Sequence, residues 1–265
     1  MSDVPNGAAD TPATAAPPAR SGGVQSLERA FGLLEMIAGN GGSMPLSTLS
    51  RNSGLPTTTL HRLARTLVDL GYLRQEPSRS YALGPRLALL ADASSAMLSA
   101  VALPHLGHLV DELGETANLA MLDADHVAYV AQVPGRHSMR MFTEVGRRVE
   151  PHCTAVGKAL LAATRNDEDV RALLERTGLT RHTPRTVVDP DELLEQLDVV
   201  RSRGYALDEG EQEVGVRCVA VNVSGSTLPL AISVSGPAPR MTDELLILAV
   251  PVLREVAARM AAELS

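Results

Sequence analysis

The sequence has little that would support several common classes of protein. It contains two cysteines, Cys153 and Cys218, with no partner at the spacing of a zinc ribbon or a redox motif. This is too few for a disulfide framework, so we expect reduced thiols. No run of about 18 apolar residues occurs, and residues 1–23 lack the basic and apolar parts of a secretion signal. We therefore expect a cytoplasmic protein without a membrane span, and a disordered tail over 1–23, which has little apolar surface to bury.

Motifs of common enzymes are also missing from the sequence. There is no nucleophile elbow, no phosphate-binding loop and no metal-ligand spacing. His152 and Cys153 are adjacent, but neighbours on a helix or strand project in different directions, so the pair does not by itself make a thiolate and its base. We expect no catalytic residue, no cofactor and no metal. An enzyme that uses Cys153 is the alternative from a different class of function.

Charge is distributed unevenly along the 265 residues. The net charge of -7 argues against a protein that coats nucleic acid indiscriminately. Residues 1–90 carry net +2, however, whereas residues 91–265 carry net -9. The segment from Arg51 to Arg86 contains six arginines and only two acidic residues. A basic island in an acidic chain predicts two domains with different partners.

The first 90 residues have the pattern of three helices and a hairpin. Apolar residues recur at helical spacing over 26–38, then Ser47 is placed to cap a short helix, and a third helix is predicted over 57–69. Alternating segments at 72–75 and 80–83 flank a Pro/Ser turn and predict a hairpin. Together these elements predict a winged helix-turn-helix domain. The apolar face expected for the first helix comprises Leu27, Ala30, Phe31, Leu34 and Ile37 or Ala38.

The helix at 57–69 has the composition expected of a recognition helix. Its leucines are spaced by 3, 4 and 3 residues and predict a buried face of Leu60, Leu63, Leu67 and Leu70. Hydroxyl groups fill the first turn, where free backbone N–H groups can also hold a phosphate, and arginines follow. Two arginines on the hairpin are placed to reach the DNA backbone or minor groove. The predicted DNA-binding residues are Thr57, Thr58, Thr59, His61, Arg62, Arg65, Arg74 and Arg79.

The remainder of the chain predicts an α+β domain. An apolar linker helix is expected over 87–103, with Pro104 as a break or kink. Strands and helices then mix without regular βαβ alternation, which favours an antiparallel sheet with helices packed on it. Strands are predicted at 117–122, 127–133, 138–142, 205–208, 218–223 and 229–235, and helices at 153–163, 167–176, 191–203 and 243–264. The predicted organisation is a tail (1–23), a winged helix-turn-helix domain (24–86), a linker helix (87–103) and a second domain (104–265).

Motifs in both halves carry a resemblance to a known family. In order along the chain they are VQSLERAFGLLEMIA, LSTLSRNSGLPTTTLHRLARTLVDLGYL, YALGPRL, GETANLAMLD, VGRRVEPHCTAVGKALL, RSRGYALDEGEQEVGVRC and ISVSGPAPRMT. From about Val24 to Leu264 the chain resembles the IclR family of bacterial transcriptional regulators. The resemblance implies a winged helix-turn-helix, a linker helix, a GAF-like effector-binding domain, and homodimers that commonly pair into tetramers.

The resemblance also implies a small-molecule pocket in the second domain. Carried over by motif, its residues are Met141, Val149, Ala155, Val156, Asp208, Val216, Cys218, Ser233 and Ser235. Ser233 and Ser235 alternate along one strand and therefore face the same side, as two hydroxyls on one ligand require. Within the family the chain looks most like the branch controlling allantoin and glyoxylate metabolism. A carboxylate such as Asp208 suits a ligand with N–H donors, such as a ureide.

These features predict a ligand-responsive repressor that holds palindromic operator DNA and leaves it when a small metabolite binds. The expected effector is a ureide such as allantoin, or glyoxylate. An activator or repressor of aromatic-acid catabolism within the same family is the alternative. The sequence alone leaves the ligand, the operator and the sign of regulation open.

Overall fold

The computed structural model describes residues 24–141 and 144–264, so the tail predicted over 1–23 lies outside the described residues. The chain divides into two compact units between Ala88 and Leu89, two residues beyond the predicted end of the first domain. The first unit is a winged helix-turn-helix and the second is an α+β domain with one antiparallel sheet. The predicted fold class is confirmed.

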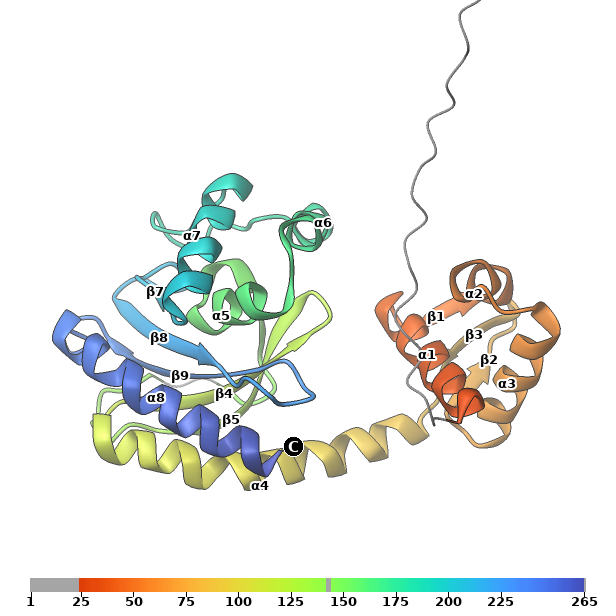
Figure 1. Cartoon of the computed structure of the whole chain (residues 1–265), viewed down its shortest axis with the longest axis horizontal. Coiled ribbons are helices and arrows are strands. Elements are labelled where there is room, and N and C mark those ends of the chain that lie inside the picture. The colour runs from red at the N-terminus through yellow and green to blue at the C-terminus, as the bar shows by residue number, and fades with distance from the viewer. Residues whose placement is uncertain (1–23, 142–143, 265) are drawn as a thin grey trace, which may run out of the picture. The chain divides into compact units, whose positions relative to one another are not determined.

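The first unit contains three helices and a small sheet (Figure 1). Its elements are α1 (Gln25–Gly39), β1 (Ser43–Pro45), α2 (Leu46–Ser53), α3 (Thr57–Asp69), β2 (Leu73–Gln75) and β3 (Ser80–Leu83). The sheet is antiparallel in the order β1-β3-β2, and β2 and β3 form the predicted hairpin. The strand β1 was not predicted, because three residues are too few to show alternation.

Two predicted buried faces in the first unit are partly wrong. In α1 the buried residues are Leu33, Leu34 and Ile37, whereas Leu27 and Phe31 are 57% and 62% exposed. The helix carries two overlapping apolar stripes, and the core of this unit covers only one of them.

The predicted face of α3 is wrong at its end. Leu60 and Leu67 are buried and Leu63 is half-buried, but Leu70 is exposed because it lies at the C-terminal end of the helix, outside the last packed turn. Ala64 completes the buried stripe instead.

The predicted cap of α2 is also wrong. The helix begins one residue before Ser47, with Pro45 at its N-cap and no side-chain capping bond.

The second unit begins within a long helix and continues into a six-stranded sheet. Its elements are α4 (Arg86–Leu113), β4 (Thr116–Asp123), β5 (His126–Val133), β6 (Arg148–Val149), the 3-10 helix η1 (Pro151–Cys153), α5 (Ala155–Thr164), α6 (Asp167–Thr177), α7 (Pro190–Arg203), β7 (Ala206–Asp208), β8 (Val216–Asn222), β9 (Leu230–Pro237) and α8 (Asp243–Glu263). The strand order is β6-β5-β4-β9-β8-β7, with every pair antiparallel. The strand predicted at 138–142 is wrong, since described residues 138–141 form no strand.

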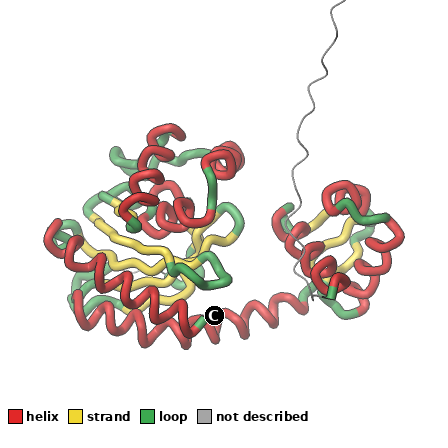
Figure 2. Tube along the Cα trace, in the orientation of Figure 1, coloured by secondary structure: helices red, strands yellow, loops and turns green. Residues whose placement is uncertain are grey.

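Helices cover both faces of this sheet (Figures 1 and 2). Alternate residues of the strands point to opposite sides, as the two-residue period of a strand requires. On β9, Ile232 and Val234 enter a core with α4 and α8, whereas Ala231 enters a core with α5. A third cluster joins α5 to α6 and α7. The serines of β9 therefore lie on the α5 side of the sheet.

One unbroken helix, α4, crosses the boundary between the units. Pro104 was expected to break or kink it, and the helix is not broken there because it continues through this residue. By length and composition alone, α4 is apolar enough to cross a membrane. Its C-terminal half is instead part of the core of the second unit, where Leu98, Leu106 and Leu109 are buried.

Candidate functional site

A helix-turn-helix presents the predicted DNA-binding residues. Helix α2 ends at Gly54, whose φ of 64° is left-handed and reverses the chain, and Pro56 then precedes α3. The Ser50 hydroxyl donates to the Leu55 carbonyl at 3.1 Å and holds the turn. The first turn of α3 therefore begins at a fixed place relative to α2.

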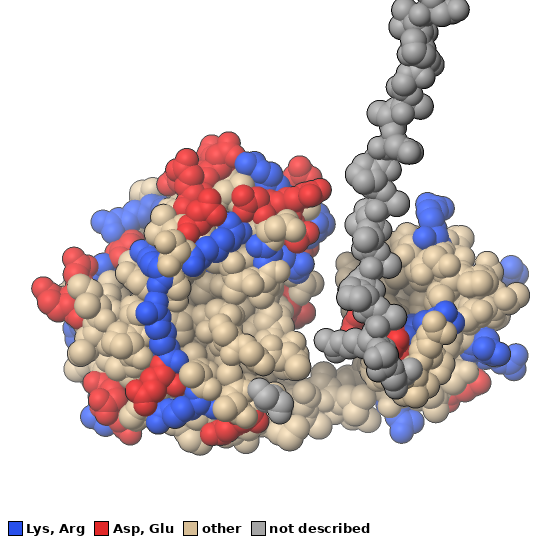
Figure 3. All heavy atoms as spheres, in the orientation of Figure 1, with Lys and Arg blue, Asp and Glu red and all other residues tan. Residues whose placement is uncertain are grey.

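The polar side of α3 is open to solvent. Thr57, Thr58, His61, Arg62 and Arg65 are exposed and Thr59 is half-exposed, and on the hairpin Arg74 and Arg79 are exposed. Among the described residues, no ion pair involves the side chains of Arg62, Arg65 or Arg79, whereas Arg74 pairs with Glu76 at 3.1 Å. Figure 3 shows basic side chains around the first unit and acidic ones gathered over α6 and α7 of the second. The exposed arginines have the charge and freedom that phosphate contacts need.

A small cavity lies on the α5 side of the second unit's sheet. It has a volume of about 50 Å³. Its lining includes seven predicted effector residues: Met141, Val149, Ala155, Asp208, Val216, Cys218 and Ser235. Sequence analysis missed Asn118, Tyr129, Arg147, Thr154, Gln212 and Glu213 in the same lining. A wider groove of about 400 Å³ between α5, α7 and α8 is rich in alanine and contains none of the predicted residues.

Two predicted effector residues, Val156 and Ser233, do not line this cavity. Asn118 Nδ2 donates to the hydroxyls of Ser233 at 3.4 Å and Ser235 at 3.2 Å, and Gln132 donates to Asn118 Oδ1 at 3.0 Å. The two serines do face the same side, as predicted from their spacing. Of the pair, only Ser235 lines the cavity, and Ser233 is held in the internal polar network.

The N-terminus of α5 lies at the cavity, which Thr154 and Ala155 line. The Thr154 hydroxyl accepts the Gly157 N–H at 3.1 Å and caps the helix. Among the described residues, no hydrogen bond uses the N–H groups of Ala155 and Val156, so the positive end of the helix is available to an anion. A Cβ on Gly157 would lie 2.2 Å from the Pro151 carbonyl oxygen, so glycine is what allows η1 to pack against α5.

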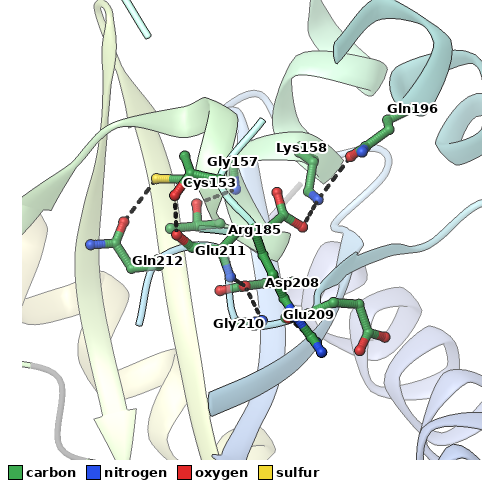
Figure 4. A network of polar contacts seen from close by, with 12 residues as sticks. Cys153, Gly157, Lys158, Arg185, Gln196, Asp208, Glu209, Gly210, Glu211 and Gln212 are labelled. Atoms are coloured by element: carbon green, nitrogen blue, oxygen red, sulfur yellow. Dashed lines mark hydrogen bonds and ion pairs between the residues drawn. The ribbon is translucent and has the colours of Figure 1, made fainter. Parts of the chain in front are cut away.

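Asp208 shapes the loop that closes the cavity (Figure 4). Its Oδ1 atom accepts the N–H groups of Gly210 at 3.0 Å and Glu211 at 2.7 Å. Burial raises the pKa of Asp208 to about 6, the charge of Glu211 adds to the rise, and the Glu211 N–H and Lys158 oppose it. The carboxyl therefore changes charge close to neutral pH. Its visible role is to organise a loop.

A buried ion pair lies beside this loop. Lys158 Nζ is 2.6 Å from Glu211 Oε1, with side-chain exposures of 4% and 7%, and Gln196 also accepts from Lys158 at 3.2 Å (Figure 4). Glu211 Oε2 has no hydrogen-bond partner among the residues that the structure describes. The hydroxyls of Thr183 and Thr186 donate to the loop carbonyls of Gly210 and Glu211, each at 2.7 Å. These contacts fix the loop against the segment between α6 and α7.

The geometry of Cys153 does not favour a nucleophile. Burial raises the pKa of its thiol to about 12, and the charges of Asp208, Glu150 and Glu211 add to the rise. The Sγ atom donates to Gln212 Oε1 at 2.9 Å, and His152 Nε2 lies 3.1 Å from the Thr180 carbonyl, not from the sulfur. A thiol in this state is a buried polar group and not an activated thiolate.

Comparisons with known proteins agree with this architecture. Residues 26–77 match the IclR helix-turn-helix domain and residues 91–262 match the bacterial transcriptional regulator IclR C-terminal domain. The chain is 40% identical over 240 residues to the transcriptional repressor IclR of Escherichia coli K12, covering 88% of this chain and 87% of that protein. It is 38% identical over 231 residues to the acetate operon repressor of Salmonella typhimurium, covering 84% of each.

Members of the predicted branch are also among the relatives. The transcriptional repressor AllR of Salmonella paratyphi A is 31% identical over 247 residues, covering 91% of this chain and 90% of that protein. The crystal structure of Thermotoga maritima IclR aligns with a TM-score of 0.61 at 27% identity, over 91% of this chain and 98% of that one. The expected ligand-responsive transcriptional repressor is confirmed, and so is the expectation that it is not an enzyme. Two matched domains in the expected order show that the chain belongs to the IclR family of bacterial transcriptional regulators.

Proposed function

We propose that this repressor controls an operon for the metabolism of a small carboxylic acid and leaves a palindromic operator when that acid enters the cavity. The observation that carries the proposal is the cavity of about 50 Å³ at the N-terminus of α5. The free N–H group of Ala155, the Arg147 side chain and the Ser235 hydroxyl are suitable partners for one carboxylate group.

The size of the cavity favours glyoxylate over allantoin as the effector. A single water molecule needs roughly 10–15 Å³ on the same measure, so a cavity of about 50 Å³ suits a compact molecule. A ureide or an aromatic acid would require the walls to move apart. The name of the acetate operon repressor, a relative of this chain, is compatible with control of small-acid metabolism.

The titration of Asp208 offers a way to tell the two ligand classes apart. An anion beside an ionised Asp208 is repelled, so binding of an acid is coupled to uptake of a proton. Because the pKa of Asp208 is about 6, affinity for an acid should fall up to about tenfold per pH unit above that value. A ureide that donates N–H groups to the ionised carboxylate should bind equally well or better as the pH rises.

We further propose that the repressor acts as a homodimer and that two such dimers associate to form a tetramer. Exposed apolar residues support this assembly: Leu27 and Phe31 on α1 are 57% and 62% exposed, and Leu89 on α4 is 71% exposed. On α8, Ile247 is 74% exposed. Such residues are expected at contacts between subunits. Two subunits also double the phosphate contacts, because each basic island alone supplies few of them.

Ligand screening tests the effector. Thermal denaturation of the full chain is measured with glyoxylate, acetate, allantoin and benzoate at pH 6 and pH 8. A true ligand at 100 times its Kd should add about 2.7 kcal/mol to the free energy of unfolding. We expect glyoxylate to stabilise the wild type at pH 6 and to do so less at pH 8. In Asp208→Asn the stabilisation by glyoxylate should no longer depend on pH. Stabilisation by allantoin alone would contradict the proposal for a small acid.

Paired variants test the division of labour between the units. We expect Arg62→Ala to weaken binding to the protein's own upstream DNA about 10–100-fold while stabilisation by the ligand is unchanged. Ser235→Ala should weaken ligand binding and leave DNA binding intact. Arg171→Ala, an exposed arginine of the second unit, is the control for loss of a surface charge. Equal binding of the wild type to any DNA sequence would contradict specific repression.

A further inference from the structure

Three side chains with metal-ligating atoms meet next to η1, outside the cavity. They are Glu150, Cys153 and His182, and their ligand atoms all lie within 4.8 Å of one another. Two of them come from the segment around η1 and the third from the loop between α6 and α7, 29 residues beyond Cys153. No ligand spacing in the sequence indicates such a site, because folding alone brings the histidine to the cysteine.

The three atoms need only small movements to coordinate one ion. His182 Nε2 is 2.5 Å from Glu150 Oε2, and the sulfur of Cys153 lies within 4.8 Å of both. A tetrahedral zinc ion has ligands at about 2.0–2.3 Å and therefore holds them about 3.3–3.6 Å apart. The oxygen and nitrogen must separate by about 1 Å, and the sulfur need approach by no more than about 1.5 Å.

Neighbouring groups already orient two of the three ligands. The Thr180 hydroxyl donates to Glu150 Oε1 at 2.7 Å and leaves Oε2 facing His182. His152 packs against the His182 ring with centroids 6.3 Å apart and an interplanar angle of 25°. Outer partners of this kind fix the orientation of metal ligands. Cys153 is buried while His182 is partly exposed, so an ion can enter from solvent and reach the sulfur at the inner end.

The geometry points to a binding site for a thiophilic divalent cation of the zinc class, formed by Glu150, Cys153 and His182, with a fourth position open to water. One sulfur, one nitrogen and one carboxylate oxygen form a ligand set that zinc accepts and that magnesium and calcium do not prefer. The bound metal ion takes the place of the proton on the Cys153 sulfur, and its bonds to His182 and Glu150 replace the direct contact between these two side chains. The released thiol proton and any proton on the imidazole go to solvent.

The site adjoins the effector cavity through one residue. Cys153 Sγ donates to Gln212 Oε1 at 2.9 Å, and Gln212 also lines the cavity (Figure 4). A metal-bound thiolate has no proton to donate, so Gln212 loses this contact and its amide is free to turn. Metal binding therefore alters one wall of the cavity without occupying it. The inference is independent of which small acid the cavity accepts.

Cobalt titration of the full, tag-free chain tests the site. After treatment with a chelator, one equivalent of Co²⁺ per chain should produce a near-ultraviolet sulfur-to-cobalt charge-transfer band, and Zn²⁺ should displace it. Cys153→Ser should abolish the band. Cys218→Ser is the matched control, because it removes the other buried cysteine and should leave the band unchanged. His182→Ala, at a partly exposed position, should weaken cobalt binding at least tenfold.

Circular dichroism of each variant shows whether it is folded, and the His182 variant keeps the test decisive if Cys153→Ser unfolds. Absence of the band in the folded wild type would overturn the inference. The inference would also be overturned if the band persisted in folded Cys153→Ser or disappeared in folded Cys218→Ser. Cobalt binding by folded His182→Ala at the wild-type affinity would overturn it as well.

Discussion

The two units differ in where they keep their polar groups. Among the described residues, every buried polar or charged side chain other than Tyr81 lies between Glu115 and Ser235, in the second unit. In the first unit the arginines of α3 are at the surface, and Arg62 and Arg65 have no ion-pair partner among the described residues. The second unit encloses Lys158, Asp208 and Glu211 and pairs them internally.

This difference matches two modes of recognition. A long polyanion is bound by exposed cations, each contributing a little and all weakened by salt. A small molecule is bound by a few enclosed polar groups whose solvation has already been lost. Substitution of the exposed arginines of the first unit should therefore lower DNA affinity with little loss of stability. The second should lose stability when its internal pairing is broken.

The largest expected effect on stability is in the buried ion pair. Lys158→Met leaves Glu211 charged and unpaired in the interior and should lower the free energy of unfolding by about 3–5 kcal/mol. Adding Glu211→Gln removes the stranded charge and should recover much of this loss. Urea denaturation of the wild type, both single variants and the double variant measures the coupling. Additive losses would contradict an energetically coupled pair.

A smaller effect is expected from Asp208, whose titration should change the free energy of unfolding by up to about 3 kcal/mol as the pH rises. Because its folded pKa of about 6 is above the ordinary value of 3.8, its stabilising contribution is complete below pH 3.8 and is lost as the pH rises through 6. Asp208→Asn keeps the acceptor oxygen and should remove this decline, as measured by urea denaturation between pH 4 and pH 7. Asp125→Asn is the control, because the stability that Asp125 contributes should change with pH in the opposite direction. A hydrogen bond from Arg176 lowers the pKa of Asp125, so its contribution is lost on acidification.

Two glycines sharpen the contrast between the units. Gly157→Ala places a Cβ against the Pro151 backbone and should cost about 1–3 kcal/mol of stability. Gly32→Ala lies in α1, where nothing is within 4 Å of the new Cβ, and should add about 0.5–1 kcal/mol. Thermal denaturation measures both. The same sign for the two variants would contradict the packing described around η1.

The smallest expected effect is at the hairpin of the first unit. Arg74 already pairs with Glu76, so Arg74→Ala should weaken DNA binding only a few-fold, equally on operator and unrelated DNA. The slope of log affinity against log salt should become shallower by about 1. Fluorescence titrations at several salt concentrations check this. A loss confined to the operator would instead assign Arg74 to base recognition.

Strong local patterns in the sequence predicted much of the fold, whereas features set by tertiary packing were missed. The spacing of leucines in α3 and the turn between β2 and β3 are local signals, and both elements are present. Leu70 and Phe31 were placed wrongly because only the assembled core decides which apolar stripe is covered. The strands β1 and β6 are too short to alternate visibly.

The candidate site shows the same limit. Most of its residues followed from family motifs. Asn118 was missed although it is a polar residue at an inward position of β4, and this position becomes evident only when the pairing of β4 with β9 is known. The meeting of Glu150 with His182 depends on how the loop after α6 folds back, and the sequence contains no local trace of it.

The alternation of β9 has a mechanical consequence. Ser235 touches the cavity, while its neighbour Val234 is packed in the core that contains α4, on the opposite face of the sheet. In the proposed function, a ligand that draws Ser235 toward itself would also move the peptide between Val234 and Ser235, and Val234 is packed in the core that contains α4. Transmission from the cavity to α4 therefore requires no chain of side chains, since the sensing and responding surfaces are the two sides of one strand.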